Sequence, residues 1–122
     1  MSYHASCLAV DLGASQGRLL FGSFDGTDIS LEEVHRFENK PVSLPTGLHW
    51  NATSLFQETL NGLEKCLRSE KAPLSLGIDT WGVDYALLDR DGSLLGLPFH
   101  YRDGRTTGVL EKAFSRMPAD EI

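Results

Sequence analysis

The sequence predicts an α/β domain with a mixed sheet, in which an antiparallel three-strand meander is followed by a helix and further strands. Short apolar runs separated by Gly-containing turns fill residues 6–37, as in consecutive hairpin strands. Between residues 52 and 69 the apolar residues recur instead at helical spacing. Short apolar runs return after Pro73, a residue type that ends helices. The chain of 122 residues is long enough for one domain with a modest core.

The meander is expected after a loose terminus at residues 1–5, and its strands are expected at 6–11, 18–24 and 29–37. The first strand is almost wholly apolar, so we expect it in the centre of the sheet with both faces covered. Asp25-Gly26 predicts the hairpin turn after the second strand. In the third strand the alternation of polar and apolar residues slips near Glu32-Glu33, which indicates a β-bulge.

The helix is expected from Ala52 to Ser69 and should pack on the meander through one apolar face, made of Phe56, Leu60, Leu63 and Leu67. Two residues compete for its N-cap. Ser54 fits a capping box with Gln57, and Asn51 is itself a good cap.

The segments on either side of this helix are less regular. Residues 38–50 are rich in Pro and Gly and are expected to form a loop, with Trp50 closing an edge of the core. After the helix the sequence predicts strands at 74–80, 83–88 and 94–101, a hairpin turn at 89–92, a polar loop at 102–107 and a short helix at 109–117.

Composition limits the class of protein and its partners. The formal net charge of −6 argues against a nucleic-acid surface, which needs a basic patch. No apolar run approaches the length of a membrane span, so neither nucleic acid nor a membrane is expected as a partner. Cys7 and Cys66 lie in apolar patterns without metal-ligand spacing and are expected to be buried free thiols. Free thiols and the lack of a leader pattern predict a cytoplasmic protein.

The stretch Asp11-Leu12-Gly13-Ala14-Ser15-Gln16-Gly17-Arg18 joins the first two strands and is rich in groups that can hold a phosphate. Its two glycines allow positive φ and a close approach of a ligand, and consecutive backbone N–H groups can form an anion-binding nest. Ser15 adds a hydroxyl donor and Arg18 a positive fork, and Asp11 can face a hydrated Mg²⁺. The stretch is not a Walker A loop, and from its residues alone a tight turn with a capping Asp explains it equally well.

Three strands, a helix and a further strand form the ribonuclease H-like core, which nucleases share with the actin/hexokinase-type ATPases. Within this class, residues 9–18 resemble the first phosphate motif of the FGGY family of carbohydrate kinases. Residues 75–84, with the run Asp-Thr-Trp-Gly-Val-Asp, resemble the corresponding stretch of one branch of that family, the rhamnulokinases. Residues 96–106 resemble the next motif of that branch, and the whole resemblance runs from about residue 8 to residue 107.

The resemblance assigns roles to individual residues. It implies that the phosphates of ATP bind at Ala14, Ser15, Gln16, Gly17 and Arg18. It also implies that Asp11 faces Mg²⁺ through water and that Gly82 contacts the sugar; the alternative for Gly82 is a bend between strands. Asp79 should face Asp11 if their strands are neighbours, and serves either the metal or substrate or a backbone turn. Asp103 and Arg105 are expected to support the sugar site as an ion pair.

The activity that the resemblance implies is ATP-dependent phosphorylation of L-rhamnulose to L-rhamnulose 1-phosphate. Members of the family have two lobes and are much longer, so residues 1–122 correspond to the N-terminal part of the first lobe, without the second lobe. Their catalytic base is then expected beyond Ile122, no catalytic residue is expected within the chain, and residues 1–122 alone are expected to be inactive.

Three alternatives stay open. Another FGGY sugar or polyol kinase would share the same motifs. A ribonuclease H-like nuclease would need carboxylates that converge on two metal ions, for which Asp11, Asp79 and either Glu58 or Glu64 fit the topology loosely. Such a nuclease leaves the phosphate-binding residues unexplained, and its acidic surface would repel nucleic acid. A third class is a non-catalytic interaction module.

Overall fold

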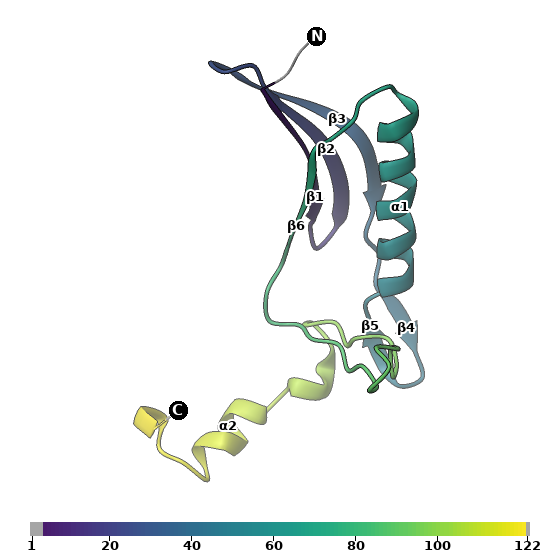
Figure 1. Cartoon of the computed structure of the whole chain (residues 1–122). Coiled ribbons are helices and arrows are strands. Elements are labelled where there is room, and N and C mark those ends of the chain that lie inside the picture. Colours follow the sequence, from purple (N-terminus) through teal and green to yellow (C-terminus); the bar gives the residue numbers. More distant parts are fainter. Residues whose placement is uncertain (1–3, 122) are drawn as a thin grey trace.

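The structure, a computed structural model, describes residues 4–121, so residues 1–3 of the expected loose terminus lie outside the described residues. Four strands form the main sheet in the order β3-β2-β1-β6 (Figure 1). They are β1 (Ala5–Leu12), β2 (Gln16–Phe24), β3 (Ile29–Glu38) and β6 (Ser75–Thr80). Neighbours among the first three are antiparallel, whereas β6 lies parallel to β1. The predicted mixed sheet with its meander is confirmed, and β1 begins already at Ala5.

Two details of the meander follow from local backbone chemistry. Gly26 has a φ of +107°, which glycine adopts without steric cost, and the expected turn at 25–26 is confirmed. The register of β2 with β3 shifts between Leu19 and Leu20 and leaves Val34 as the extra residue on β3. The predicted bulge is therefore confirmed, one residue further along the chain than expected.

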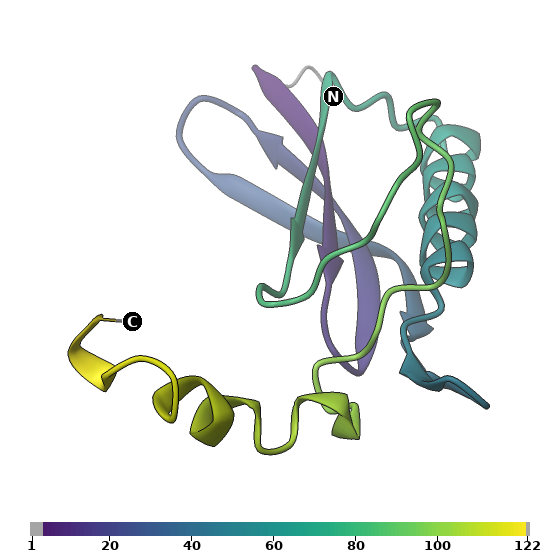
Figure 2. The ribbon, with the colours of Figure 1, turned by 90° about the horizontal axis from the view of Figure 1, so that it is seen from below.

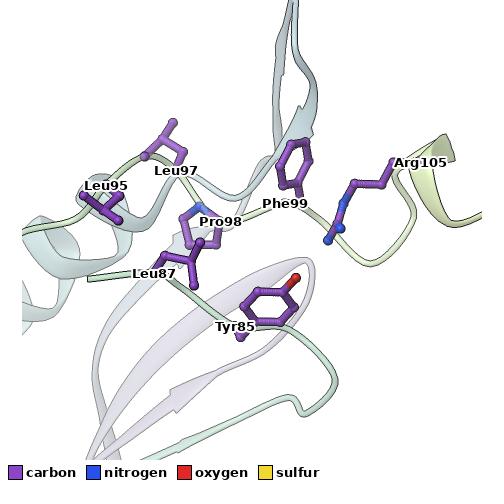
Figure 3. Close-up of a pocket in the computed structure, with 8 residues that line it drawn as sticks. Tyr85, Leu87, Leu95, Leu97, Pro98, Phe99 and Arg105 are labelled. Atoms are coloured by element: carbon purple, nitrogen blue, oxygen red, sulfur yellow. The ribbon is translucent and has the colours of Figure 1, made fainter. Parts of the chain in front are cut away.

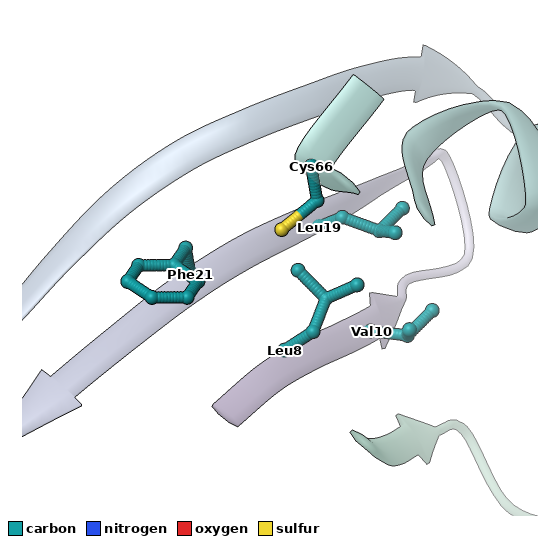
Figure 4. Close-up of a cluster of buried hydrophobic side chains, with 5 residues drawn as sticks. All are labelled: Leu8, Val10, Leu19, Phe21 and Cys66. Atoms are coloured by element: carbon teal, nitrogen blue, oxygen red, sulfur yellow. The ribbon is translucent and has the colours of Figure 1, made fainter. Parts of the chain in front are cut away.

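Helix α1 (Ala52–Arg68) covers one face of the sheet, and the core lies between them (Figure 4). The fully buried side chains of this core are Leu8, Val10, Leu19, Phe21 and Cys66. Gly62 lies where the helix crosses β2: a Cβ there would meet Leu19 Cδ2 at 2.6 Å. Asn51 is the N-cap, because its side chain accepts a hydrogen bond of 3.1 Å from the backbone N–H of Ser54. Of the two candidate N-caps, Asn51 therefore occupies the position, and Ser54 does not cap the helix through a box with Gln57.

The apolar face of α1 differs from the predicted one. Leu63 packs against the core, but Phe56, Leu60 and Leu67 are exposed, Phe56 to 67%. The residues that touch the sheet are instead small, Gly62 and Cys66, because the helix approaches the sheet closely there. The apolar spacing correctly predicted the helix and the packing of Leu63 on the core, but the other three side chains of the predicted face are exposed.

Strand β1 is central, as expected, but α1 covers only the face that carries Leu8 and Val10. On the other face Cys7 is exposed and Ala9 is half-buried, so the expectation that both faces are covered is wrong within the described residues. Both cysteines are free, and Cys66 is buried as predicted, whereas the expectation of a buried Cys7 is wrong.

Residues 38–50 contain a short hairpin where the sequence predicted a loop. Its strands are β4 (Val42–Leu44) and β5 (Gly47–His49). Gly47 turns the chain with a φ of +132°. The hairpin is then held from outside: Asp103 accepts a hydrogen bond of 2.7 Å from the backbone N–H of Leu48. Because Asp103 is so distant in the sequence, no local pattern could predict that it stabilises a hairpin here. The Pro and Gly content alone predicted a loop.

The two strands predicted after β6, at 83–88 and 94–101, do not form. The turn at 89–92 is present, and one isolated bridge joins Leu88 to Leu94. The apolar side chains here are largely exposed, with Leu87 at 62% and Leu95 at 67%. Their alternation therefore does not correspond to a buried sheet face in the described structure.

The C-terminal part is a series of short turns of helix that extend away from the sheet and α1 (Figures 1 and 2). They are η1 (Gly104–Thr106), α2 (Val109–Phe114) and η2 (Ala119–Glu121). The short helix expected at 109–117 is confirmed in type and ends three residues early at Phe114. None of the helices between residues 4 and 121 has the length and apolarity to cross a membrane.

Candidate functional site

Four charged residues form a row across one end of the sheet. Arg36, Arg18, Asp11 and Asp79 are register partners on β3, β2, β1 and β6. Register partners on neighbouring strands point to the same face, and here that face is the one opposite α1. Arg18 Nε donates a 2.8 Å hydrogen bond to Asp11 Oδ2. The expected proximity of Asp79 to Asp11 is thus confirmed, at the carboxyl ends of two parallel strands.

The turn between β1 and β2 lies directly beyond this row. It is closed by a hydrogen bond of 2.9 Å from the backbone N–H of Gly13 to the carbonyl oxygen of Gln16. Ala14, Ser15 and Gln16 are exposed, so their backbone and hydroxyl groups are accessible to a ligand. Backbone donors with one hydroxyl in an exposed turn are suited to anionic oxygens.

Asn39 holds this turn, and the sequence did not reveal it. Its side chain donates a 2.8 Å hydrogen bond to the carbonyl oxygen of Gly13, and its backbone N–H donates one of 2.9 Å to the carbonyl oxygen of Ser15. Asn39 is only 4% exposed, which fixes the turn rigidly against the end of β3. An Asn in a Pro-rich stretch has many local explanations, so no sequence signal would have found this role.

The two glycines of the turn are needed because they lack a Cβ atom, and not because of their φ angles. Neither has a positive φ, so the expectation that they supply that conformation is wrong. A Cβ at Gly13 would lie 2.8 Å from the carbonyl oxygen of Gln16. A Cβ at Gly17 would lie 2.2 Å from Phe37 Cζ. Gly13 thus permits the turn to close, and Gly17, which is buried, permits Phe37 to pack on β2.

The row contains two carboxylates that bear on metal binding. Among the described residues no group of three or more His, Cys, Asp or Glu side chains could hold a metal ion. Asp11 and Asp79 are a pair of carboxylates, which fits Mg²⁺ because this ion takes one or two carboxylates and completes its shell with water and phosphate oxygens.

The carboxylates expected for a nuclease do not converge. Glu58 Oε2 lies 2.6 Å from His35 Nε2, and Glu64 pairs with Arg68 along α1. Both are on the helix that covers the sheet face opposite to Asp11. The geometry therefore favours phosphate binding at the turn over a two-metal site.

A cavity of about 240 Å³ opens at the same end of the sheet, beside Leu12 and Thr80, the last residues of β1 and β6. Its other walls include Trp50, Trp81 and Asp84. Crevices at the carboxyl ends of strands are the usual ligand sites of open α/β sheets. The cavity and the phosphate-type turn therefore share one edge of the sheet.

Gly82 lies between two of these wall residues. A Cβ at Gly82 would meet nothing within 4 Å, so the space before its backbone is open. The bend that follows is carried by Val83, whose φ of +70° is rare for a β-branched residue. Gly82 is thus at a bend, as the alternative reading had it, but its own conformation does not require glycine.

Aromatic rings support this cavity from behind. The Trp50 ring lies 4.2 Å from the Trp81 ring and stacks on His100 at 3.9 Å between centroids. Burial lowers the pKa of His100, partly opposed by the Asp84 carboxylate and aided by Arg102. His100 Nδ1 accepts a 3.0 Å hydrogen bond from the backbone N–H of Arg102, which needs the neutral ring. Trp50 is 2% exposed, so the sequence correctly predicted a buried residue.

Asp103 ties the following loop to the hairpin. Its carboxylate accepts from the backbone N–H groups of Leu48, at 2.7 Å, and Arg105, at 2.9 Å. These two hydrogen bonds, in that order, lower the pKa of Asp103. Arg105 Nε lies 3.8 Å from Asp103 Oδ1, so the expected ion pair is present. The guanidinium group of Arg105 also lies over the Phe99 ring.

A second cavity of about 240 Å³ adjoins the first and shares Tyr85 and Pro98 with it (Figure 3). Its lining is mainly apolar, with Leu87, Leu95 and Phe99, and Arg105 supplies the charge. Of the residues that the sequence singled out, it contains Arg105, which was expected to support the sugar site, but none that was expected to contact ATP or sugar.

No family model matches the chain. The rhamnulokinase of Oceanobacillus iheyensis is 42% identical over 115 residues, which are 94% of this chain. The rhamnulokinase of Mannheimia succiniciproducens is 46% identical over 116 residues, or 93% of this chain. The chain spans only 24% of the length of each of these relatives.

Solved structures of sugar kinases share the fold. Gluconate kinase from Lactobacillus acidophilus superposes with a TM-score of 0.74 at 10% identity, over 92% of this chain and 23% of that one. Plasmodium falciparum glycerol kinase with ADP gives 0.70 at 16% identity, over 96% of this chain and 24% of that one. The predicted actin/hexokinase-type fold is confirmed. Sequence and fold together identify the chain as a relative of the rhamnulokinases, within the FGGY family of carbohydrate kinases.

Proposed function

We propose that the complete protein transfers the γ-phosphoryl group of ATP to L-rhamnulose and forms L-rhamnulose 1-phosphate in the cytoplasm. The observation that carries this proposal is the identity of 41–46% with rhamnulokinases, which runs through both the phosphate-type turn and the cavity-lining stretch. Residues 1–122 are then the N-terminal part of the first lobe, since the relatives are about four times as long.

The turn between β1 and β2 receives the phosphates of ATP in this proposal. The groups that contact them are Ala14, Ser15, Gln16, Gly17 and Arg18, of which the first three are exposed. Asp11 faces Mg²⁺ through water. Its present partner, Arg18, keeps both terminal guanidinium nitrogens for phosphate oxygens, because only Nε bonds to Asp11. When bound, Mg²⁺ neutralises charge on the transferring phosphoryl group.

The sugar lies in the cavity next to this turn and reaches Gly82, which is not itself a wall of the cavity but lies between two wall residues, Trp81 and Asp84, in the sequence. Open space before Gly82 lets a hydroxyl group reach the backbone, and the shared sheet edge brings that hydroxyl towards the phosphates. The catalytic base lies beyond Ile122, so residues 1–122 alone turn over no sugar.

The test is an assay of ADP release with L-rhamnulose, run on the complete protein and on residues 1–122. Sugar-dependent ADP release by the complete protein alone is expected. Release with a different ketose or polyol would keep the kinase and reject this sugar, and turnover by residues 1–122 would contradict the position of the base.

Gly82→Val tests the sugar contact within the same assay. The branched side chain fills the approach, so the KM for the sugar should rise more than the KM for ATP. Equal rises in both KM values would favour a bend without ligand contact.

A further inference from the structure

Asp84 is held in an unusual way. Its Oδ2 accepts two indole hydrogen bonds, one of 2.6 Å from Trp50 Nε1 and one of 2.8 Å from Trp81 Nε1. Indole N–H groups only donate, so these bonds require an acceptor at this position and fix it from two directions. The sequence showed the acidic residue, but not that an indole from outside its own segment would fix it.

The second oxygen of Asp84 remains available. No described residue donates a hydrogen bond to Oδ1. No buried side-chain oxygen or nitrogen among residues 4–121 lacks a partner, so Oδ1 is accessible from outside. The carboxylate is a wall of the cavity that also contains Leu12 and Thr80. A fixed acceptor thus stands open in an otherwise mainly apolar and aromatic cavity.

A purely structural role would not need this arrangement. A single neutral acceptor, such as an amide oxygen, is enough for two indole N–H groups. The carboxylate adds a charge and a second acceptor, and the chain adopts the strained φ of +70° at Val83 immediately before it. The cavity therefore combines a fixed carboxylate acceptor with flat apolar walls. This combination matches a polyhydroxylated ligand, because its hydroxyl groups can donate to the carboxylate while its C–H faces lie on the rings.

We propose that Asp84 is a substrate-binding and specificity-determining residue, whose Oδ1 accepts hydrogen bonds from hydroxyl groups of the sugar, and that Trp50 and Trp81 are the positioning residues that hold it. The inference rests on the proposed function, because it names a polar contact of the same sugar site. ATP is the less suitable occupant, since a carboxylate repels phosphate groups.

Asp84→Asn in the complete protein separates the two roles of the carboxylate. Its amide oxygen can still accept from both indoles, which places the amide N–H₂ where Oδ1 was and turns the acceptor into a donor. We expect the KM for L-rhamnulose to rise about tenfold or more, as for loss of a hydrogen bond to a charged group, with the KM for ATP and the melting temperature nearly unchanged. Trp81→Phe is the matched control: it removes one indole donor but leaves Trp50, so a smaller rise in the same KM is expected.

Analogues of the sugar that each lack one hydroxyl group identify the contact. The wild type and Asp84→Asn should have nearly equal kcat/KM for the analogue that lacks the contacted hydroxyl, and differ for the others. If the KM for the sugar is unchanged in Asp84→Asn, or if the KM for ATP rises instead, the inference about Asp84 is wrong. The proposed function still stands in that case, provided that the wild type is active. A wild type without sugar-dependent ADP release would refute the proposed function itself. If Asp84→Asn does not fold, Asp84→Glu, which keeps the charge but displaces it, should show the same selective rise.

Discussion

The sheet with α1 and the segment after β6 are held together by different interactions. In the first region, regular backbone pairing joins β1, β2, β3 and β6, and a small apolar core lies under the helix. In residues 81–107 no strand forms, and a few isolated contacts hold the chain. Backbone hydrogen bonds join Pro98 and His100 to Trp50 and Leu48. Side chains supply the rest: Asp84 on two indoles, Asp103 on the hairpin, and rings stacked around Trp50. The first region is a scaffold with distributed stability, whereas the second depends on a few groups.

Trp50→Ala should have the largest effect on this contrast. Its ring contacts Trp81, His100 and Tyr101, and it is almost fully buried, so its loss should cost about 3–5 kcal/mol. We expect amide hydrogen exchange to rise in residues 81–107 of the complete protein while β1 and β2 stay protected. Trp50→Phe is the control, because it keeps a smaller aromatic ring at this position and removes the indole N–H, so a smaller rise in exchange is expected. Equal loss of protection in both regions would show that they unfold as one unit.

Ser15→Ala tests the function of the scaffold edge without altering its stability. The hydroxyl group is exposed and has no structural contact to lose. One hydrogen bond to a charged phosphate is removed, so the binding of ATP should weaken by about 1.5–3 kcal/mol in calorimetry on the complete protein. Unchanged ATP affinity and turnover would refute the phosphate assignment of this turn.

Gly62→Ala should destabilise the scaffold by about 1–3 kcal/mol, through overpacking in the core. Alanine is the better helix former, but the added Cβ would meet Leu19 Cδ2 at 2.6 Å, and Leu19 is fully buried. Denaturant unfolding measures the change. The control is Glu64→Ala, on the same helix but with an exposed side chain that pairs only with Arg68, so a small change is expected. A stabilised Gly62→Ala would show that the core yields at this point.

The smallest effect is a pH dependence confined to the second region. Burial lowers the pKa of His100 below its ordinary 6.5, so the folded state binds fewer protons than the unfolded state just below that pH. Stability should therefore fall as the pH drops below about 6.5. His100→Asn keeps an acceptor for the backbone N–H of Arg102 and cannot titrate, so its stability should be flatter over this range. A slope equal to that of the wild type would assign the effect to another group.

The same division explains what the sequence could predict. Regular periodicity and turn chemistry located the meander, α1 and β6. The expectation that Asp79 faces Asp11 depended on their strands being neighbours, and the parallel pairing of β1 with β6 meets that condition. Alternating apolar residues at 83–88 and 94–101 wrongly predicted strands, because alternation alone does not supply a pairing partner. Asn39 and Asp84 were missed in their roles, since each acts through partners that are distant along the chain.

The parallel pairing of β6 with β1 also has a consequence for synthesis on the ribosome. β1 can pair with β2 as soon as both have emerged, but its other edge must wait until β2, β3 and α1 have been made and β6 follows. Closing so long a loop has an entropic cost that local hairpins avoid. During that interval the edge of β1 that faces away from β2 has no partner. An unpaired apolar edge of this kind is a surface on which another nascent chain can add a strand. The synthesis of β6 (Ser75–Thr80) and its pairing with β1 therefore end the period in which the growing chain is most prone to aggregate.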